Sequence, residues 1–310
     1  MTDREPSGKL KCMRRLIFGA GLQLAATCPL QPQQVPGRDL LQFPVGTIAE
    51  APALASLTGD GVWNPAATAL PDSARYRVGA AALQTGSDQS LSAQILSAAV
   101  ALPTQTTVGL SFLRVAVSDI LQTSTDPQSI GGEVPYATTI VSATVARRQE
   151  RLVAGLAARY RTGTIDREQR SALGIDAGLL AERLPVADAR VGLSTFLWRP
   201  ANRSDEQTTF NAAADLRVFG TRPARETRAG YSLSLTEGLA AEHYVFTSAR
   251  SGVWEGRAGL SRTDVYERTS WRLRLGVGVH YAGYIVGVAR EENGSGLAPY
   301  YQFCLTALIH

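Results

Sequence analysis

The sequence predicts an all-β fold: a 14-stranded antiparallel up-and-down transmembrane β-barrel with an N-terminal lumenal hatch. Three observations predict the barrel, namely an unbroken two-residue alternation in the stretch 270–281, fourteen runs of strand-like sequence, and connections that alternate in length. A chain of 310 residues, 45% of them hydrophobic, has enough material for one large β domain.

The stretch 270–281 is the clearest strand. Its apolar face carries Trp271, Leu273, Leu275, Val277, Val279 and Tyr281, and its other face carries Arg272, Arg274, Gly276, Gly278 and His280. The apolar face begins and ends with an aromatic residue, as expected for a strand that meets lipid and places rings at both interfaces. The same pattern also fits one strand of a soluble sandwich, so repetition along the chain must decide between them.

Residues 1–28 are predicted to be a secretory signal peptide. Arg14 and Arg15 form a basic start, Leu16 to Ala26 form a short apolar core, and small residues follow. Met13 is the better start for such a signal, which suggests that the true chain begins there. Because Cys28 follows Ala25, Ala26 and Thr27, lipidation of this cysteine is an alternative outcome of processing.

Charge and cysteine content exclude several classes of function. The residues before Cys28 carry +3 of the net charge of +4, so the mature chain is nearly neutral and we predict no nucleic-acid partner. The three cysteines (Cys12, Cys28 and Cys304) and three histidines (His243, His280 and His310) show no metal-ligand spacing. We therefore predict neither a metal site nor a cofactor.

Residues 29–75 are predicted to form a leader and a hatch. The part from Pro29 to Gly37 is rich in Pro and Gln, and between Arg38 and Leu70 several prolines and glycines interrupt any long strand or helix. The apolar content of this segment is too high for a disordered linker. A compact segment that packs against something larger, such as the inside of a barrel, fits both observations.

A short motif in this segment resembles a known family. Trp63, Asn64, Pro65 and Ala66, after a secretion signal and before a run of strands, are similar to the Asn-Pro-Ala segment of the FadL-like outer-membrane proteins, which include the PorV and PorQ group. The resemblance implies a hatch inside a 14-stranded barrel. The Gly-rich, Met-containing run that the family has upstream is replaced here by Phe43 to Ala55. The alternative is that Asn64 and Pro65 only form a turn into the first strand.

Residues 76–310 are predicted to be the barrel. The fourteen strand-like runs are Tyr76 to Gln84, Leu91 to Ala101, Thr106 to Val117, Ala137 to Ala146, Leu152 to Arg161, Ser171 to Ala181, Ala189 to Trp198, Thr208 to Phe219, Thr227 to Leu235, Ala241 to Ala249, Val253 to Ser261, Ser270 to Tyr281, Gly283 to Arg290 and Pro299 to Ile309. The third and fourth runs alternate less cleanly than the others.

The connections between these runs favour a membrane barrel. Links after odd-numbered runs tend to be long and polar, at 118–136, 162–170, 199–207, 262–269 and 291–298, whereas links after even-numbered runs tend to be short. A barrel with short periplasmic turns and longer external loops has this alternation, and a sandwich does not. Together with the signal peptide, this pattern predicts a bacterial outer-membrane location. The last run resembles the C-terminal strand of outer-membrane barrels, although Ile309 and His310 replace the usual terminal aromatic.

The lumen is predicted to be lined by arginines. Arg151, Arg159, Arg161, Arg228, Arg272 and Arg274 fall on the polar faces of their strands, with Asp176 and Glu255 as expected partners. Such a ladder either braces and hydrates the lumen or anchors the head group of an amphipathic cargo. No nucleophile motif or phosphate loop is present, so we predict no enzyme.

The predicted function is the passage of a hydrophobic or amphipathic small molecule across the outer membrane, with membrane lipid as the surrounding partner. The residues expected to take part in binding are Trp63, Asn64, Pro65, Ala66, Arg159, Arg161, Arg272, Arg274 and His280. Two alternatives remain open. The first is a PorV-like partner barrel that holds secreted proteins through its external loops, and the second is a purely structural barrel.

Overall fold

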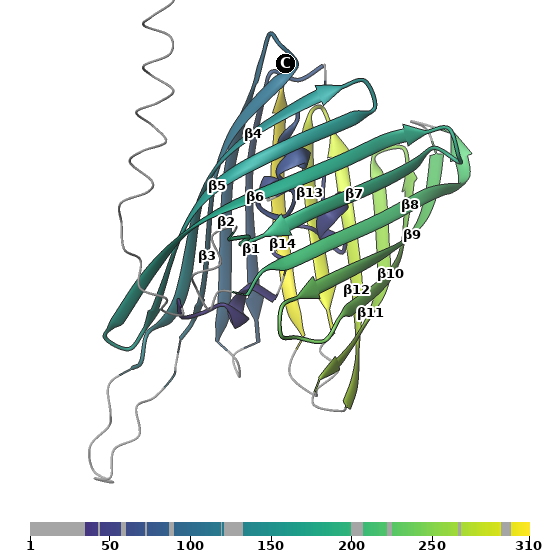
Figure 1. Cartoon of the computed structure of the whole chain (residues 1–310). Coiled ribbons are helices and arrows are strands. Elements are labelled where there is room, and N and C mark those ends of the chain that lie inside the picture. The colour runs from purple at the N-terminus through teal and green to yellow at the C-terminus, as the bar shows by residue number, and fades with distance from the viewer. Residues whose placement is uncertain are drawn as a thin grey trace, which may run out of the picture.

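Fourteen strands, each antiparallel to its neighbours, close into one barrel in chain order, with β1 paired to both β2 and β14 (Figure 1). The computed structural model describes residues 35–42, 44–56, 60–71, 73–86, 90–118, 120, 133–199, 207–221, 225–265, 268–292 and 299–310. The strands are β1 (Tyr76–Thr85), β2 (Leu91–Leu102), β3 (Thr106–Val117), β4 (Tyr136–Gln149), β5 (Leu152–Ile165), β6 (Glu168–Leu184), β7 (Ala189–Phe196), β8 (Thr209–Thr221), β9 (Arg225–Thr236), β10 (Glu242–Ser251), β11 (Trp254–Val265), β12 (Arg268–Tyr281), β13 (Tyr284–Glu291) and β14 (Tyr300–Ile309). The predicted 14-stranded antiparallel barrel is therefore confirmed, while the predicted signal peptide lies outside the described residues.

In the described residues before β1, the helical elements are short turns. They are η1 (Asp39–Gln42), η2 (Pro52–Leu54), α2 (Asp60–Trp63) and η3 (Pro65–Thr68). Within the described ranges, no helix is long and apolar enough to cross a membrane.

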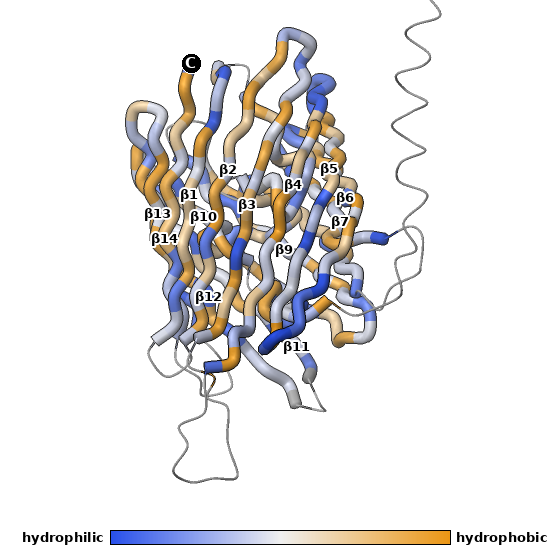
Figure 2. Tube along the Cα trace, turned by 90° about the vertical axis from the view of Figure 1, so that its left-hand side faces the viewer, coloured by the Kyte–Doolittle hydropathy of each residue, from blue (hydrophilic) through white to orange (hydrophobic). Residues whose placement is uncertain are grey.

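Apolar and polar side chains separate onto the two faces of the barrel wall. Burial alternates along most strands, and Figure 2 shows hydrophobic and hydrophilic residues alternating along the chain trace. The exposed members of the alternation are large and apolar, including Leu96, Leu110, Leu156, Leu173, Val245 and Val277. A water-soluble protein rarely exposes so extensive an apolar surface, whereas a lipid-facing barrel requires one.

Aromatic rings mark both ends of this outer surface. At the end where β1 begins and β14 ends, the exposed rings are Tyr76, Phe219, Trp254, Tyr281 and Tyr284. At the opposite end they are Phe210, Trp271 and Tyr301. Rings in these positions are typical of barrels whose ends lie at the two membrane interfaces.

The alternation of long and short connections holds only in part. The connections at 118–135, 197–208 and 292–299 are long, as predicted, and they share one end of the barrel, which we name the loop end; the opposite end is the turn end. The predicted loops at 162–170 and 262–269 are wrong. Strands β5 and β6 continue to Ile165 and from Glu168, and β11 continues to Val265. Backbone pairing does not depend on hydropathy, so polar residues extend these strands past the apolar belt.

A segment that precedes β1 lies inside the barrel, and we name its described residues, 35–42, 44–56 and 60–70, the lumenal segment (Figure 1). It starts near the loop end, where Arg161 Nη2 of β5 donates hydrogen bonds to the carbonyls of Val35 (3.0 Å) and Pro36 (2.7 Å). It ends near the turn end, where Leu70 N donates to Thr107 Oγ1 of β3 (3.1 Å). Inward-facing side chains thus satisfy the backbone groups that an irregular segment leaves unpaired.

The Asn-Pro-Ala motif forms a buried helix cap inside the barrel. Asn64 Oδ1 accepts from Ala66 N (3.0 Å), and Asn64 Nδ2 donates to the carbonyl of Ala53 (2.6 Å), which joins η3 to η2. Gly155 of β5 and Gly178 of β6 face this motif, and no room for a Cβ exists at either position. The motif is therefore more than a turn into β1, because it docks the segment on the wall.

An ion pair between two fully buried side chains braces the same wall. Arg159 of β5 pairs with Asp176 of β6, and Arg159 also donates to the carbonyl of Val62. Removing one member of a buried pair leaves the other charge without compensation.

We expect Arg159→Met to lower the free energy of unfolding by about 3–5 kcal/mol. This is measured by urea titration in micelles, with the electrophoretic mobility shift of folded barrels as readout. Arg159→Met with Asp176→Asn should recover part of that loss; equal stability of wild type and Arg159→Met would contradict the bracing role.

Candidate functional site

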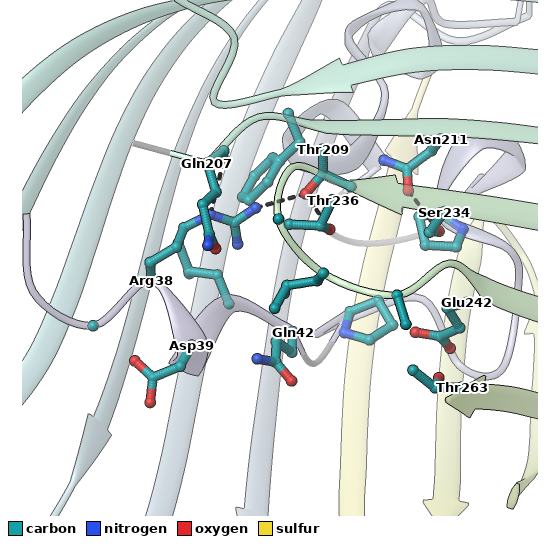
Figure 3. A pocket seen from close by; sticks show the side chains of 18 of the residues that line it. Arg38, Asp39, Gln42, Gln207, Thr209, Asn211, Ser234, Thr236, Glu242 and Thr263 are labelled. Atoms are coloured by element: carbon teal, nitrogen blue, oxygen red, sulfur yellow. Dashed lines mark hydrogen bonds between the residues drawn. The ribbon is translucent and has the colours of Figure 1, made fainter. Parts of the chain in front are cut away.

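The lumen contains a cavity of about 960 Å³ at the loop end. Its walls are η1, other residues of the lumenal segment, and the loop-end parts of β4 to β12 (Figure 3). We name it the loop-end cavity. Its size falls within the range of sites that hold small organic ligands.

A second cavity, of about 480 Å³, lies at the turn end, and we name it the turn-end cavity. It is bounded by the β12–β13 turn (Tyr281 to Gly283) and by charged side chains that include Arg190, Arg228, Glu255 and Arg257. Both cavities border the strands β9, β10 and β12, so they lie along the same side of the lumen.

The stretch 44–53 of the lumenal segment separates the two cavities. Pro44 and Pro52 line the loop-end cavity, while Glu50 lines the turn-end cavity. Glu50 is buried and pairs with Arg190 (Nη2 to Oε1, 3.3 Å) and Arg257 (Nη1 to Oε2, 3.2 Å). One carboxylate thus ties this stretch to two strands of the wall, β7 and β11.

The turn before Glu50 has an unfavourable backbone conformation. Ile48 and Ala49 both have positive φ angles, 49° and 60°, which side chains with a Cβ rarely adopt. Contacts with the wall hold the turn in place: Tyr244 Oη donates to the carbonyl of Ala49 (2.6 Å), and Ile48 packs against Gly276 and Gly287. Such a conformation persists only where its surroundings impose it.

The four arginines predicted as site residues divide into two pairs. Arg159 and Arg161 bind backbone carbonyls of the lumenal segment, so they hold that segment and are not open to a ligand. Arg272 and Arg274 line the loop-end cavity, but each pairs with both Glu242 and Glu291. The arrangement is that of a braced wall, in which carboxylates already neutralise the guanidinium groups.

Two other predicted positions, Arg151 and Glu255, differ from expectation. Arg151 is exposed in the β4–β5 turn and does not face the lumen, because β5 begins one residue later. Glu255 pairs with Arg257 (2.8 Å) and with His280 (2.7 Å), and not with the predicted arginines. His280 lines the turn-end cavity, at the opposite end of the lumen from Trp63.

Of the four motif residues, Trp63 alone borders a cavity. Its indole Nε1 donates to the carbonyl of Val45 (2.8 Å), and its ring lies 5.0 Å from that of Phe196. Asn64, Pro65 and Ala66 are buried against β4, β5 and β6 and line neither cavity.

Sequence reasoning missed several residues of the site. Three of them, Glu50, Arg190 and Arg257, line the turn-end cavity. The others line the loop-end cavity and are Arg38, Asn211, Ser232, Ser234 and Thr263. Strand alternation puts most of them on inward faces, but the same alternation marks every other inward residue, so it could not single them out.

No protein-family model matches this chain. No curated protein matches it either.

Solved structures with a similar fold include two hydrocarbon channels. CymD, a monoaromatic hydrocarbon channel, superposes with a TM-score of 0.52 at 11% identity, over 86% of this chain and 98% of CymD. A ΔS2S3 mutant of TodX, also a monoaromatic hydrocarbon channel, gives a TM-score of 0.52 at 9% identity, over 86% and 98%. OprB from Pseudomonas putida superposes with a TM-score of 0.41 at 10% identity, over 76% of this chain and 91% of OprB. At such low identity the likeness shows the barrel fold alone.

Proposed function

We propose that this chain is a bacterial outer-membrane barrel that passes a hydrophobic or amphipathic small molecule across the membrane, with the lumenal segment as its hatch. The observation that carries the proposal is the pair of cavities, one at each end of the lumen, with the stretch 44–53 between them. Displacing that short stretch would join the cavities into one path without opening the barrel wall.

Two further observations support this function. The outer face is an apolar belt with aromatic ends, which suits a barrel surrounded by lipid. Two solved barrels of similar fold, CymD and the TodX mutant, are channels for monoaromatic hydrocarbons. The FadL-like resemblance of the Asn-Pro-Ala motif is consistent with the same kind of transport.

Flux into liposomes tests the function. The full mature chain is reconstituted into liposomes that contain β-glucosidase, and 4-nitrophenyl glucoside is added outside. This neutral, amphipathic solute releases coloured 4-nitrophenolate only after it enters. We expect faster colour formation than in protein-free liposomes. Rates no faster than in protein-free liposomes, for the wild type and for the hatch-opening variants, would refute transport. Recovery of the protein from the soluble periplasm would refute the location, and co-purification of secreted proteins without flux would favour the partner barrel.

Crowding the turn at Ile48 is expected to open the hatch. A Cβ at Gly276 would lie 2.8 Å from Ile48 Cγ2 and 2.9 Å from the Ile48 carbonyl oxygen, so Gly276→Val must push the turn away from β12. We expect this variant to increase glucoside flux several-fold. The matched control is Gly278→Val on the same face of β12, where the nearest atom would be 3.8 Å from the Cβ. If both variants behave alike, the turn at Ile48 does not set the flux.

A further inference from the structure

One wall of the loop-end cavity is rich in uncharged hydrogen-bonding side chains. Strand register places Asn211, Ser234, Glu242 and Thr263 side by side across β8 to β11, with Thr209 and Thr236 in the adjacent row (Figure 3). All six line the cavity. Hydroxyl and amide groups therefore form a strip on this side, which the carboxylate of Glu242 interrupts.

Several groups of this wall keep hydrogen-bonding capacity for a ligand. Asn211 Oδ1 accepts from Ser234 Oγ (2.8 Å), but within the described part of the chain Asn211 Nδ2 has no partner. The hydroxyl of Ser232, which also lines the cavity, likewise has no partner among the described residues. The hydroxyl of Thr263 has none either, but neighbouring atoms cover it. Buried polar groups normally have partners, so groups left open at a cavity indicate a polar occupant.

Another part of the lining is apolar and carries rings, of which Phe196 pairs in register with Thr209 of the strip. It is formed by Leu41, Pro44 and Pro52 of the lumenal segment together with the adjacent rings of Trp63 and Phe196. Rings and prolines offer flat apolar surfaces, and they favour a ligand with a flat apolar body.

The charges around the cavity balance. Among the described residues, its lining contains four arginines and four carboxylates, namely Arg38, Arg170, Arg272, Arg274, Asp39, Glu168, Glu242 and Asp264. Arg272 and Arg274 pair with Glu242, and Arg170 pairs with Glu168 (2.8 Å). The cavity therefore offers no net charge to attract an ion.

Arg38 is the cation in this cavity that is best placed to bind an anionic ligand. It donates to the carbonyl of Gln207 (3.1 Å) and to Thr209 Oγ1 (2.6 Å), and its guanidinium lies 5.6 Å from the centre of the Phe196 ring. Burial lowers the pKa of Arg38 to about 10, so the group stays charged at neutral pH. Two of its three nitrogens are committed, and Asp39, the next residue, would repel an approaching carboxylate.

We propose that the loop-end cavity binds an uncharged ring compound that carries hydroxyl groups, with its ring against Trp63 and Phe196 and its hydroxyls on Asn211, Ser232 and the adjoining strip. This proposal rests on the proposed transport function, for which it names the substrate class. A hydrocarbon would leave the strip unsatisfied, and a carboxylate would lose its hydration without gaining a free cation.

Binding of three probes with one ring shape tests the class. They are 4-hydroxybenzyl alcohol, which is neutral with a hydroxyl at each end, 4-methylbenzoate, an anion, and p-xylene, a hydrocarbon. Saturation-transfer NMR on the full mature chain in nanodiscs, with empty nanodiscs subtracted, reports the binding of each. We expect binding of the dihydroxy probe to exceed that of the other two. Tighter binding of 4-methylbenzoate or of p-xylene, or no binding of any probe, would overturn the proposal.

Two serine variants locate the binding. Ser232→Ala removes an inward hydroxyl of the loop-end cavity, while Ser248→Ala removes an inward hydroxyl of the turn-end cavity and serves as the matched control. We expect Ser232→Ala to weaken the binding of 4-hydroxybenzyl alcohol roughly three- to tenfold, as for the loss of one hydrogen bond. The binding of p-xylene should not change. Equal effects of the two variants would refute the assigned position.

The two proposals fail in different ways. Binding of 4-hydroxybenzyl alcohol without glucoside flux would leave the binding site standing and remove the transport function. Glucoside flux combined with preferred binding of p-xylene would support the transport function and refute the proposed ligand class. The binding measurement needs no movement of the lumenal segment, so a closed hatch does not mask its result.

Discussion

Replacing Glu50 by Gln is expected to raise glucoside flux roughly 5- to 150-fold, because a change of about 1–3 kcal/mol in a closed–open equilibrium shifts populations by that factor. Glu50 is the carboxylate through which the stretch 44–53 pairs with Arg190 and Arg257, and its Oε2 also accepts from the backbone and the hydroxyl of Ser56, both at 2.9 Å. Gln keeps the shape of the side chain but removes the charge. Stopped-flow colour formation in the liposome assay measures the change.

Asp188→Asn is the matched control for Glu50→Gln. Asp188 also pairs with two arginines, Arg217 (3.7 Å) and Arg228 (3.5 Å), but all three belong to the barrel wall and its turns, not to the lumenal segment. Neutralising this carboxylate should therefore leave flux near the wild-type value. If Glu50→Gln also left flux unchanged while the protein remained folded, Glu50 would be a structural group and not the latch of a hatch.

The wall of the barrel was predictable from sequence because its rule is local. Lipid on one side and a packed lumen on the other force a two-residue alternation, and that alternation can be read from stretches such as Ser270 to Tyr281. The rule fails where lipid ends. Thr162 pairs with Ser171 and Thr164 with Gln169 in β5 and β6, although these polar residues have the composition of a loop.

The interior was less predictable because its partners are distant in sequence. Glu50 meets Arg190 and Arg257 only after the barrel closes and the lumenal segment enters it. Strand alternation predicts that Arg161 faces inward. It does not predict that Arg161 binds the carbonyls of Val35 and Pro36. A sequence shows which residues face the lumen, whereas the register and the path of the segment decide which of them meet.

The partners of the lumenal arginines distinguish between the two roles that their positions allow. The ladder was open to two interpretations, as a brace or as an anchor for an amphipathic head group. In the structure Arg159 and Arg161 hold the lumenal segment, and Arg272 and Arg274 are neutralised by Glu242 and Glu291. Bracing therefore accounts for these four residues, and the loop-end cavity owes its open hydrogen-bonding capacity to uncharged residues such as Asn211.

Deleting Arg38 to Leu70 is expected to have the largest effect on permeability. This change removes nearly all of the lumenal segment, so the two cavities should merge into one water-filled pore. The barrel itself should still close, because β1 to β14 are joined by backbone pairing that does not involve the segment. Arginines that bind the segment, such as Arg77 and Arg161, would then be hydrated by lumenal water and not left buried without partners.

The measurement for this deletion is flux of 4-nitrophenyl maltohexaoside, a bulkier solute that the closed lumen should exclude. We expect background flux for the wild type and Glu50→Gln, because the displaced stretch still occupies part of the lumen, and flux orders of magnitude higher for the deletion. Heat-dependent electrophoretic mobility establishes that each barrel is folded before its flux is compared. A folded deletion barrel that excludes the maltohexaoside as well as the wild type does would show that something other than the lumenal segment closes the lumen, and the hatch would have to be abandoned.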